Sequence, residues 1–103
     1  MRNRFSLTPA ARSALREILL DIAEENPDTA ERVRVRFLDR FSELSRSPGT
    51  GHYHEELLDR RYRFSNLFSW VICYEWERRP IRVIGIAHGA RDLEAWFGSG
   101  DGD

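Results

Sequence analysis

Residues 70–74 read Trp-Val-Ile-Cys-Tyr, and residues 81–88 read Ile-Arg-Val-Ile-Gly-Ile-Ala-His. The first run is apolar at every position, which is typical of a strand buried on both faces of a sheet. The second run is a further strand, reached through a turn at residues 77–80. Before both, residues 61–64 alternate arginine with an aromatic residue, which is the period of a strand with one apolar face. Because the links are short, the three strands predict an antiparallel meander.

Two helices are expected before these strands. Thr8 followed by Pro9 is typical of an N-cap and a first helical position, and Asn26-Pro27 ends one helix and begins the next. Apolar residues recur at helical spacing, at Ala11, Leu15, Ile18, Leu19 and Ile22 in the first helix and at Ala30, Val33, Phe37, Phe41 and Leu44 in the second. So short a link predicts an antiparallel helical hairpin.

A first strand at residues 4–7 precedes the hairpin. If every connection reverses the chain, this strand runs antiparallel to either edge of the meander. We therefore predict an α+β fold of order β-α-α-β-β-β, with a small, mostly antiparallel four-stranded sheet. The helical hairpin packs on one face, and residues 91–97 form a short C-terminal helix. Residues 1–97 then make a single domain, and residues 98–103, which are small and polar, make a disordered tail.

Composition excludes several classes of protein. The chain has 103 residues, a formal net charge of −1 and one cysteine, so an internal disulfide framework and a cysteine-rich zinc site are excluded. No run approaches the roughly 20 apolar residues of a membrane helix, and the first residues hold no secretory signal. We expect a soluble cytoplasmic protein. All 16 basic residues are arginine, which binds phosphate and carboxylate well but is a poor general base.

Four segments, in this order, resemble a known family. They are Phe-Ser-Leu-Thr-Pro-Ala-Ala at 5–11, Pro-Gly-Thr-Gly at 48–51, Ile-Cys-Tyr-Glu at 72–75 and Ile-Gly-Ile-Ala-His-Gly-Ala-Arg-Asp-Leu at 84–93. Over residues 4–97 the chain is similar to the RelE/ParE superfamily of toxins from bacterial type II toxin–antitoxin modules. The resemblance implies a small antiparallel sheet with a helical hairpin on one face, which agrees with the connectivity.

The superfamily divides by activity. RelE-like members are ribosome-dependent endoribonucleases that cut mRNA, whereas ParE-like members poison DNA gyrase without known nuclease chemistry. The segment at residues 88–93 is more similar to the ParE-like side. The resemblance therefore implies a ParE-like toxin that inhibits DNA gyrase, is neutralised by a cognate antitoxin in a hetero-oligomer, and uses no cofactor. The alternative is a RelE-like mRNA endoribonuclease acting on the ribosome. A third possibility is a decayed or regulatory homologue that binds only its antitoxin and operator.

Cleavage of RNA requires a group that takes a proton from the ribose, cations that stabilise the phosphorane, and an acid for the leaving oxygen. On the endoribonuclease alternative, these roles fall to Arg61, Arg63, His88 and Arg91. The chain departs from the RelE-like pattern, because it has no lysine and no tyrosine after Tyr74. Proton transfer would rest on His88 alone. The ParE-like alternative requires no catalytic residue.

The residues that we expect to bind partners are Arg63, His88, Arg91, Trp96 and Phe97. Two large aromatic residues beside a polar tail are costly to expose, so we expect Trp96 and Phe97 to pack in the complex with the antitoxin. Purely structural roles stay open for His88 at a strand end and for Arg63 on a solvated sheet face. His52, His54 and Glu55 are too local a group to predict a metal site.

Overall fold

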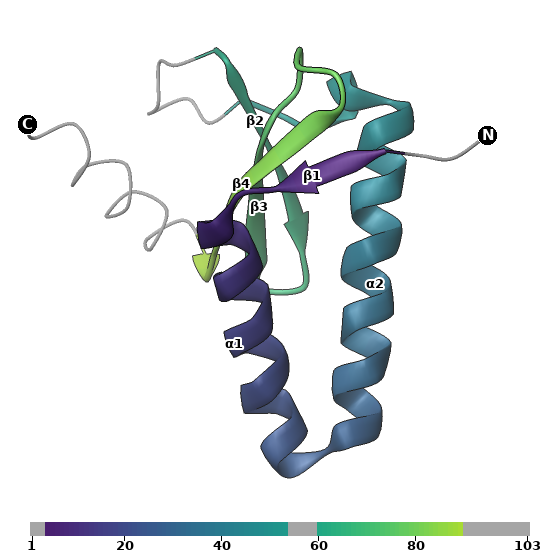
Figure 1. Ribbon diagram of the computed structural model, residues 1–103, viewed down its shortest axis with the longest axis vertical. Coiled ribbons are helices and arrows are strands. Elements are labelled where there is room, and N and C mark those ends of the chain that lie inside the picture. The colour runs from purple at the N-terminus through teal and green to yellow at the C-terminus, as the bar shows by residue number, and fades with distance from the viewer. Residues whose placement is uncertain (1–3, 54–59, 90–103) are drawn as a thin grey trace, which may run out of the picture.

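The computed structural model describes residues 4–53 and 60–89. A four-stranded sheet and a long helical hairpin form two layers, and the hairpin extends well past the end of the sheet (Figure 1). The elements are β1 (Phe5–Leu7), α1 (Pro9–Glu25), α2 (Pro27–Arg46), the 3-10 turn η1 (Pro48–Thr50), β2 (Tyr62–Leu67), β3 (Trp70–Glu75) and β4 (Ile81–Ala87). The α+β class and the order of the two long helices and four strands agree with the prediction, whereas the 3-10 turn η1 between α2 and β2 was not predicted. The helix expected at residues 91–97 and the tail lie outside the described residues.

The sheet has the order β1-β4-β3-β2 and is mixed. β2, β3 and β4 form the predicted antiparallel meander. β1, however, pairs parallel with β4, with Phe5 opposite Ile81 and Leu7 opposite Val83. The prediction of a mostly antiparallel sheet, with β1 antiparallel to its neighbour, was therefore wrong.

The connection between β1 and α1 explains the difference. The prediction assumed that each connection reverses the chain, but Thr8, which joins the two elements, hydrogen-bonds the carbonyl oxygens of Val83 and Ile84, and α1 then continues toward His88 beyond the end of β4. α1 therefore leaves β1 without reversing, whereas α2 and then β2 each reverse the chain, so β2 and β4 both run parallel to β1 (Figure 1).

The outer edge of β2 already has partners, which leaves β4 as the edge for β1. The backbone of His52 exchanges two hydrogen bonds with Phe64, of 2.9 and 2.7 Å. The guanidinium of Arg40 in α2 donates to the carbonyl oxygen of Asn66 at 2.6 Å and to the hydroxyl of Ser65 at 2.9 Å. An edge strand with satisfied backbone groups does not recruit another strand.

Two capping residues position the hairpin as predicted. The Oγ1 of Thr8 accepts a hydrogen bond from the Ala11 N–H at 3.1 Å and begins α1. Asn26 ends α1 by donating its N–H to Ile22, and its Oδ1 accepts from the Thr29 N–H at 3.1 Å to begin α2. One residue thus serves both helix ends, which is why the two helices turn back on each other so sharply.

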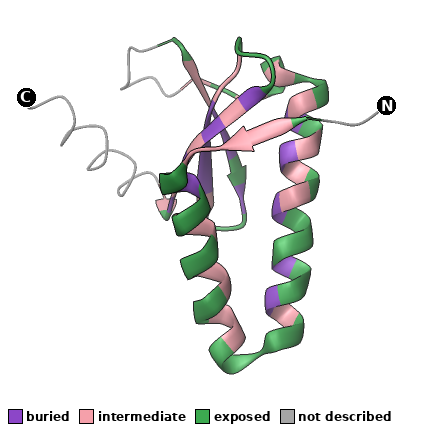
Figure 2. Ribbon diagram, in the orientation of Figure 1, coloured by how far each residue is buried: buried purple, intermediate pink, exposed green. Residues whose placement is uncertain are grey.

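The apolar stripe predicted for α2 is its buried side, made of Ala30, Val33, Phe37, Phe41 and Leu44 (Figure 2). The Phe41 ring lies 5.3 Å from the Phe5 ring of β1, and the Phe37 ring lies 5.7 Å from Trp70 of β3. β3 is buried on both faces, since neighbouring Cys73 and Tyr74 each have 0% exposure. Both expectations for these segments are confirmed.

Tyr74 places its hydroxyl where the chain leaves α2. The hydroxyl donates to the carbonyl oxygen of Pro48 at 2.6 Å and accepts from the N–H of Gly51 at 3.0 Å. A side chain on Gly51 would reach to 2.3 Å from that hydroxyl, so glycine is required there by space. Burial raises the pKa of Tyr74, although the Gly51 hydrogen bond and the charge of Arg63 oppose the shift.

Replacing Tyr74 by phenylalanine is expected to cost about 1–3 kcal/mol of unfolding free energy at neutral pH, because two partly buried backbone groups lose their partner. Because the pKa of Tyr74 is raised in the folded protein, its hydroxyl ionises at lower pH in the unfolded chain. The stabilisation by Tyr74 is therefore complete below the usual tyrosine pKa of about 10 and declines above it. The stability difference between wild type and Tyr74→Phe should therefore narrow above about pH 10 in urea denaturation. A difference independent of pH would contradict this assignment.

Candidate partner-binding surfaces

Arg63 lies between two aromatic rings at one end of the sheet. The carbon at the centre of its guanidinium is 4.2 Å from the centre of the Trp76 ring and 4.4 Å from that of Tyr53. Its Nη1 donates to the carbonyl oxygen of Gly51 at 2.7 Å. The Nε atom is buried without a hydrogen-bond partner. Both faces and one edge of the cation are thus occupied by the protein itself.

Arg60 also contacts the Tyr53 ring. The carbon at the centre of its guanidinium is 4.2 Å from the centre of that ring. The Trp76 indole N–H in turn donates to the carbonyl oxygen of Arg60 at 3.0 Å. Arg61 was predicted to share a strand face with Arg63. It lies just before β2 and is exposed, and its guanidinium is 5.2 Å from the centre of the Tyr62 ring. These contacts join the entry to β2 with the end of β3.

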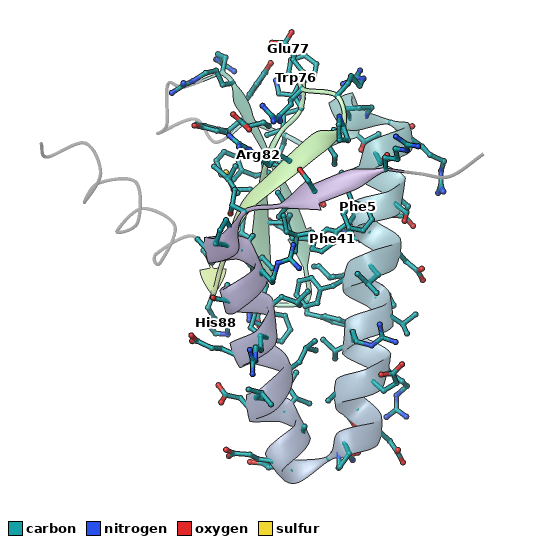
Figure 3. The ribbon with its side chains drawn as sticks, in the orientation of Figure 1. Phe5, Phe41, Trp76, Glu77, Arg82 and His88 are labelled. Carbon is teal, nitrogen blue, oxygen red and sulfur yellow. The ribbon has the colours of Figure 1, made fainter. Side chains whose placement is uncertain are left out.

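His88 follows β4 at the opposite end of the sheet and is exposed (Figure 3). Its Nε2 is 3.3 Å from the Ser69 hydroxyl, and its ring meets Trp70 edge-on at 6.0 Å. Ser69 lies in the turn between β2 and β3, and Trp70 is the first residue of β3. His88 therefore lies at the β2–β3 hairpin, where the side chain is available to a partner.

The structure does not bring Arg63 and His88 together. Arg63 pairs with Tyr74 in the sheet, whereas His88 follows Ala87, which pairs with Val71. The two positions are separated by about four residues of strand, or about 13 Å. Arg91, Trp96 and Phe97, the other predicted site residues, lie outside the described residues.

A groove of about 500 Å³ lies between α1 and the end of β4 and has His88 at its rim. Its lining is apolar at Ala14, Ile18, Trp70 and Ile86. Glu17 and Asp21 line it as well, one turn apart on α1, and neither forms an ion pair within residues 4–53 and 60–89. Such a groove fits an apolar segment that also carries a positive charge. Sequence reasoning missed these carboxylates, since on a helix they read as ordinary solvent-facing residues.

Phe68 was also missed. It is the first of two turn residues between β2 and β3, has a positive φ of 55°, and is 57% exposed. Its ring meets Trp70 edge-on at 6.1 Å. The signal in the sequence was a large apolar residue at a turn position that usually holds glycine or asparagine.

The part of the chain that the structure describes contains no group of three or more side chains able to hold a metal ion. His54 and Glu55, which were weighed as ligands beside His52, fall outside it. None of its helices is long and apolar enough to span a membrane.

Comparison with known proteins agrees with the fold and extends it. The family model described as "ParE toxin of type II toxin-antitoxin system, parDE" matches residues 5–93. A solved structure titled "Chromosomal ParDE TA system from P. aeruginosa" superposes with a TM-score of 0.67 at 14% sequence identity, covering 82% of this chain and 94% of that chain. No curated protein matches. Since the family model spans most of its length, the chain belongs to the family of ParE toxins of type II toxin–antitoxin systems.

Proposed function

We propose that this ParE-family toxin arrests cells by binding and inhibiting DNA gyrase, without a catalytic group of its own. The observation that carries the proposal is the family match over residues 5–93. The geometry of the arginines supports it. Arg63, which would stabilise the phosphorane on the endoribonuclease alternative, is enclosed by Trp76, Tyr53 and the Gly51 carbonyl. Its position lies about 13 Å from that of His88 along the strands and two strands away across the sheet, which leaves cation and proton donor too far apart to act on one phosphate.

The gyrase assignment is tested by adding purified toxin to a supercoiling reaction. We expect supercoiling to fall and cleaved plasmid to accumulate with rising toxin concentration. His88→Ala should keep this inhibition if His88 moves no proton, whereas an mRNA endoribonuclease that depended on it would lose about two or more orders of magnitude of activity. Codon-specific cutting of mRNA in a translation reaction, with supercoiling unaffected, would contradict the proposal and support the RelE-like alternative.

Arg63 acts in this proposal as a structural residue. Replacing it by alanine removes two ring contacts and a charged hydrogen bond to the Gly51 carbonyl, so we expect a loss of about 2–3 kcal/mol of unfolding free energy. The matched control is Arg12→Ala, at an exposed position of α1, which should change stability by about 0.5 kcal/mol or less. Denaturant unfolding measures both. Equal stability of Arg63→Ala and wild type would leave Arg63 available for phosphate.

The family pairs each toxin with an antitoxin. We assign the groove between α1 and β4 to a segment of the antitoxin. Its apolar floor and its two carboxylates, Glu17 and Asp21, suit an amphipathic segment that carries a basic residue, and His88 at the rim is a partner contact. Trp96 and Phe97 stay predicted contacts of the antitoxin, and Arg91 stays a predicted partner contact; all three lie outside the described residues.

A bulky side chain in the groove should block the antitoxin. Ala14 is half-buried and lines the groove, so Ala14→Trp is expected to weaken antitoxin binding at least about tenfold in calorimetry. Ser13→Trp, on the exposed residue next to it, is the control and should bind like wild type. Equal affinity of both variants for the antitoxin would remove the groove from the interface.

A further inference from the structure

We infer that Phe68 and the adjoining surface of α2 form a docking site for an acidic, partly apolar segment of the toxin's protein target. This patch consists of Phe68, Val33, Val35, Arg32 and Arg36. Its residues enclose a hollow of about 540 Å³, which Thr29 and Glu31 complete. The inference deepens the proposed function, since it names the surface through which the toxin reaches its target.

Phe68 is unfavourable for the protein alone in two independent ways. Its φ of 55° lies in the left-handed region, which is a genuine outlier for a bulky residue. The residue is also 57% exposed to solvent. Stability alone would favour asparagine or glycine at this turn. Strained backbone together with an exposed aromatic ring is typical of a functional contact.

The neighbouring surface extends the exposed apolar area. Val35 on α2 is 41% exposed and shares the hollow with Phe68 and the edge of buried Val33. The Arg36 guanidinium lies over the Phe68 ring at 5.2 Å from its centre, so the cation and the ring present one mixed surface. An aromatic residue beside arginine is the composition found at the energetic centres of protein interfaces.

The charge on this patch specifies the occupant. Glu31 already binds Arg34 at 2.6 Å, and that hydrogen bond lowers the pKa of Glu31 and keeps it ionised. Arg32 donates to the Thr29 hydroxyl at 3.1 Å, and neither Arg32 nor Arg36 forms an ion pair within the described residues. Two uncompensated cations around an apolar hollow complement a peptide segment with carboxylates beside an apolar side chain.

This patch differs from the groove between α1 and β4, and it fits a protein better than a nucleic acid. The groove assigned to the antitoxin is lined by α1 and carries carboxylates, whereas the patch is lined by α2 and carries guanidinium groups, so one segment does not complement both. A nucleic-acid backbone would match the arginines but would leave the apolar hollow unmatched. An acidic protein segment with an apolar side chain matches both.

The test compares variants of the full chain in four measurements: growth arrest on induction, inhibition of gyrase supercoiling, antitoxin affinity and melting temperature. Phe68→Asn removes the ring and accepts a positive φ, so the protein should melt at an equal or higher temperature. It should lose at least about 30-fold in toxic potency and keep its antitoxin affinity. Phe68→Tyr should retain potency within about threefold, and Arg36→Gln should weaken it about fivefold to tenfold.

Leu20→Gln is the matched control, because Leu20 is 56% exposed on α1, away from the patch. It should retain full potency. The inference is overturned if Phe68→Asn stays as toxic as wild type, if antitoxin affinity falls in proportion to potency, or if the patch arginines bind a DNA duplex in anisotropy. Wild-type growth arrest without gyrase inhibition would overturn the gyrase proposal alone, since the growth assay still decides the patch. A wild-type chain that arrests nothing overturns both.

Discussion

Thr8 connects β1 to α1 and holds both to β4. Its N–H donates to the carbonyl oxygen of Val83 at 3.0 Å, and its hydroxyl donates to that of Ile84 at the same distance while capping α1. The helix therefore begins at a fixed point on the sheet, beside the parallel β1–β4 pair. From there α1 passes along the end of β4, which creates the groove, and Asn26 returns the chain so that α2 covers the rest of the sheet face.

The two surfaces that we assign to partners meet at one residue. Trp70 lines the groove on the α1 side and contacts both His88 and Phe68, whose ring opens the patch on the α2 side. The Phe37 ring supports Trp70 from the core. Opposite charges on either side of one indole allow two partners to recognise neighbouring areas of a small protein with little competition between their charges.

A chain with arginine as its basic residue uses several of these cations inside its own structure. Arg63 stacks between Trp76 and Tyr53, and Arg40 satisfies the edge of β2. Arg82 pairs with Glu75 across two strands at 2.7 Å. The planar guanidinium suits these stacked and hydrogen-bonded positions better than an ammonium group does. The arginines left to bind partners are those that form no ion pair within the described residues, and they include Arg32 and Arg36.

The sequence alone determined the local structure and the family. Helix boundaries at Thr8 and Asn26, the buried stripe of α2 and the two-sided burial of β3 follow from caps and periodicity, which act between residues close in the chain. The segments that resemble RelE/ParE toxins pointed to the family that the comparison shows. These features required no knowledge of how distant segments meet.

Tertiary structure decided the direction of β1 relative to β4, the separation of Arg63 from His88 and the exposure of Phe68 on its strained turn. Each depends on strand register and on where β1 and α1 meet β4, which join residues far apart in sequence. A period-two pattern states which side chains share a face, but it contains neither whether a connection reverses the chain nor the neighbours that occupy an edge. Those are set by closure of the backbone hydrogen bonds across the whole sheet.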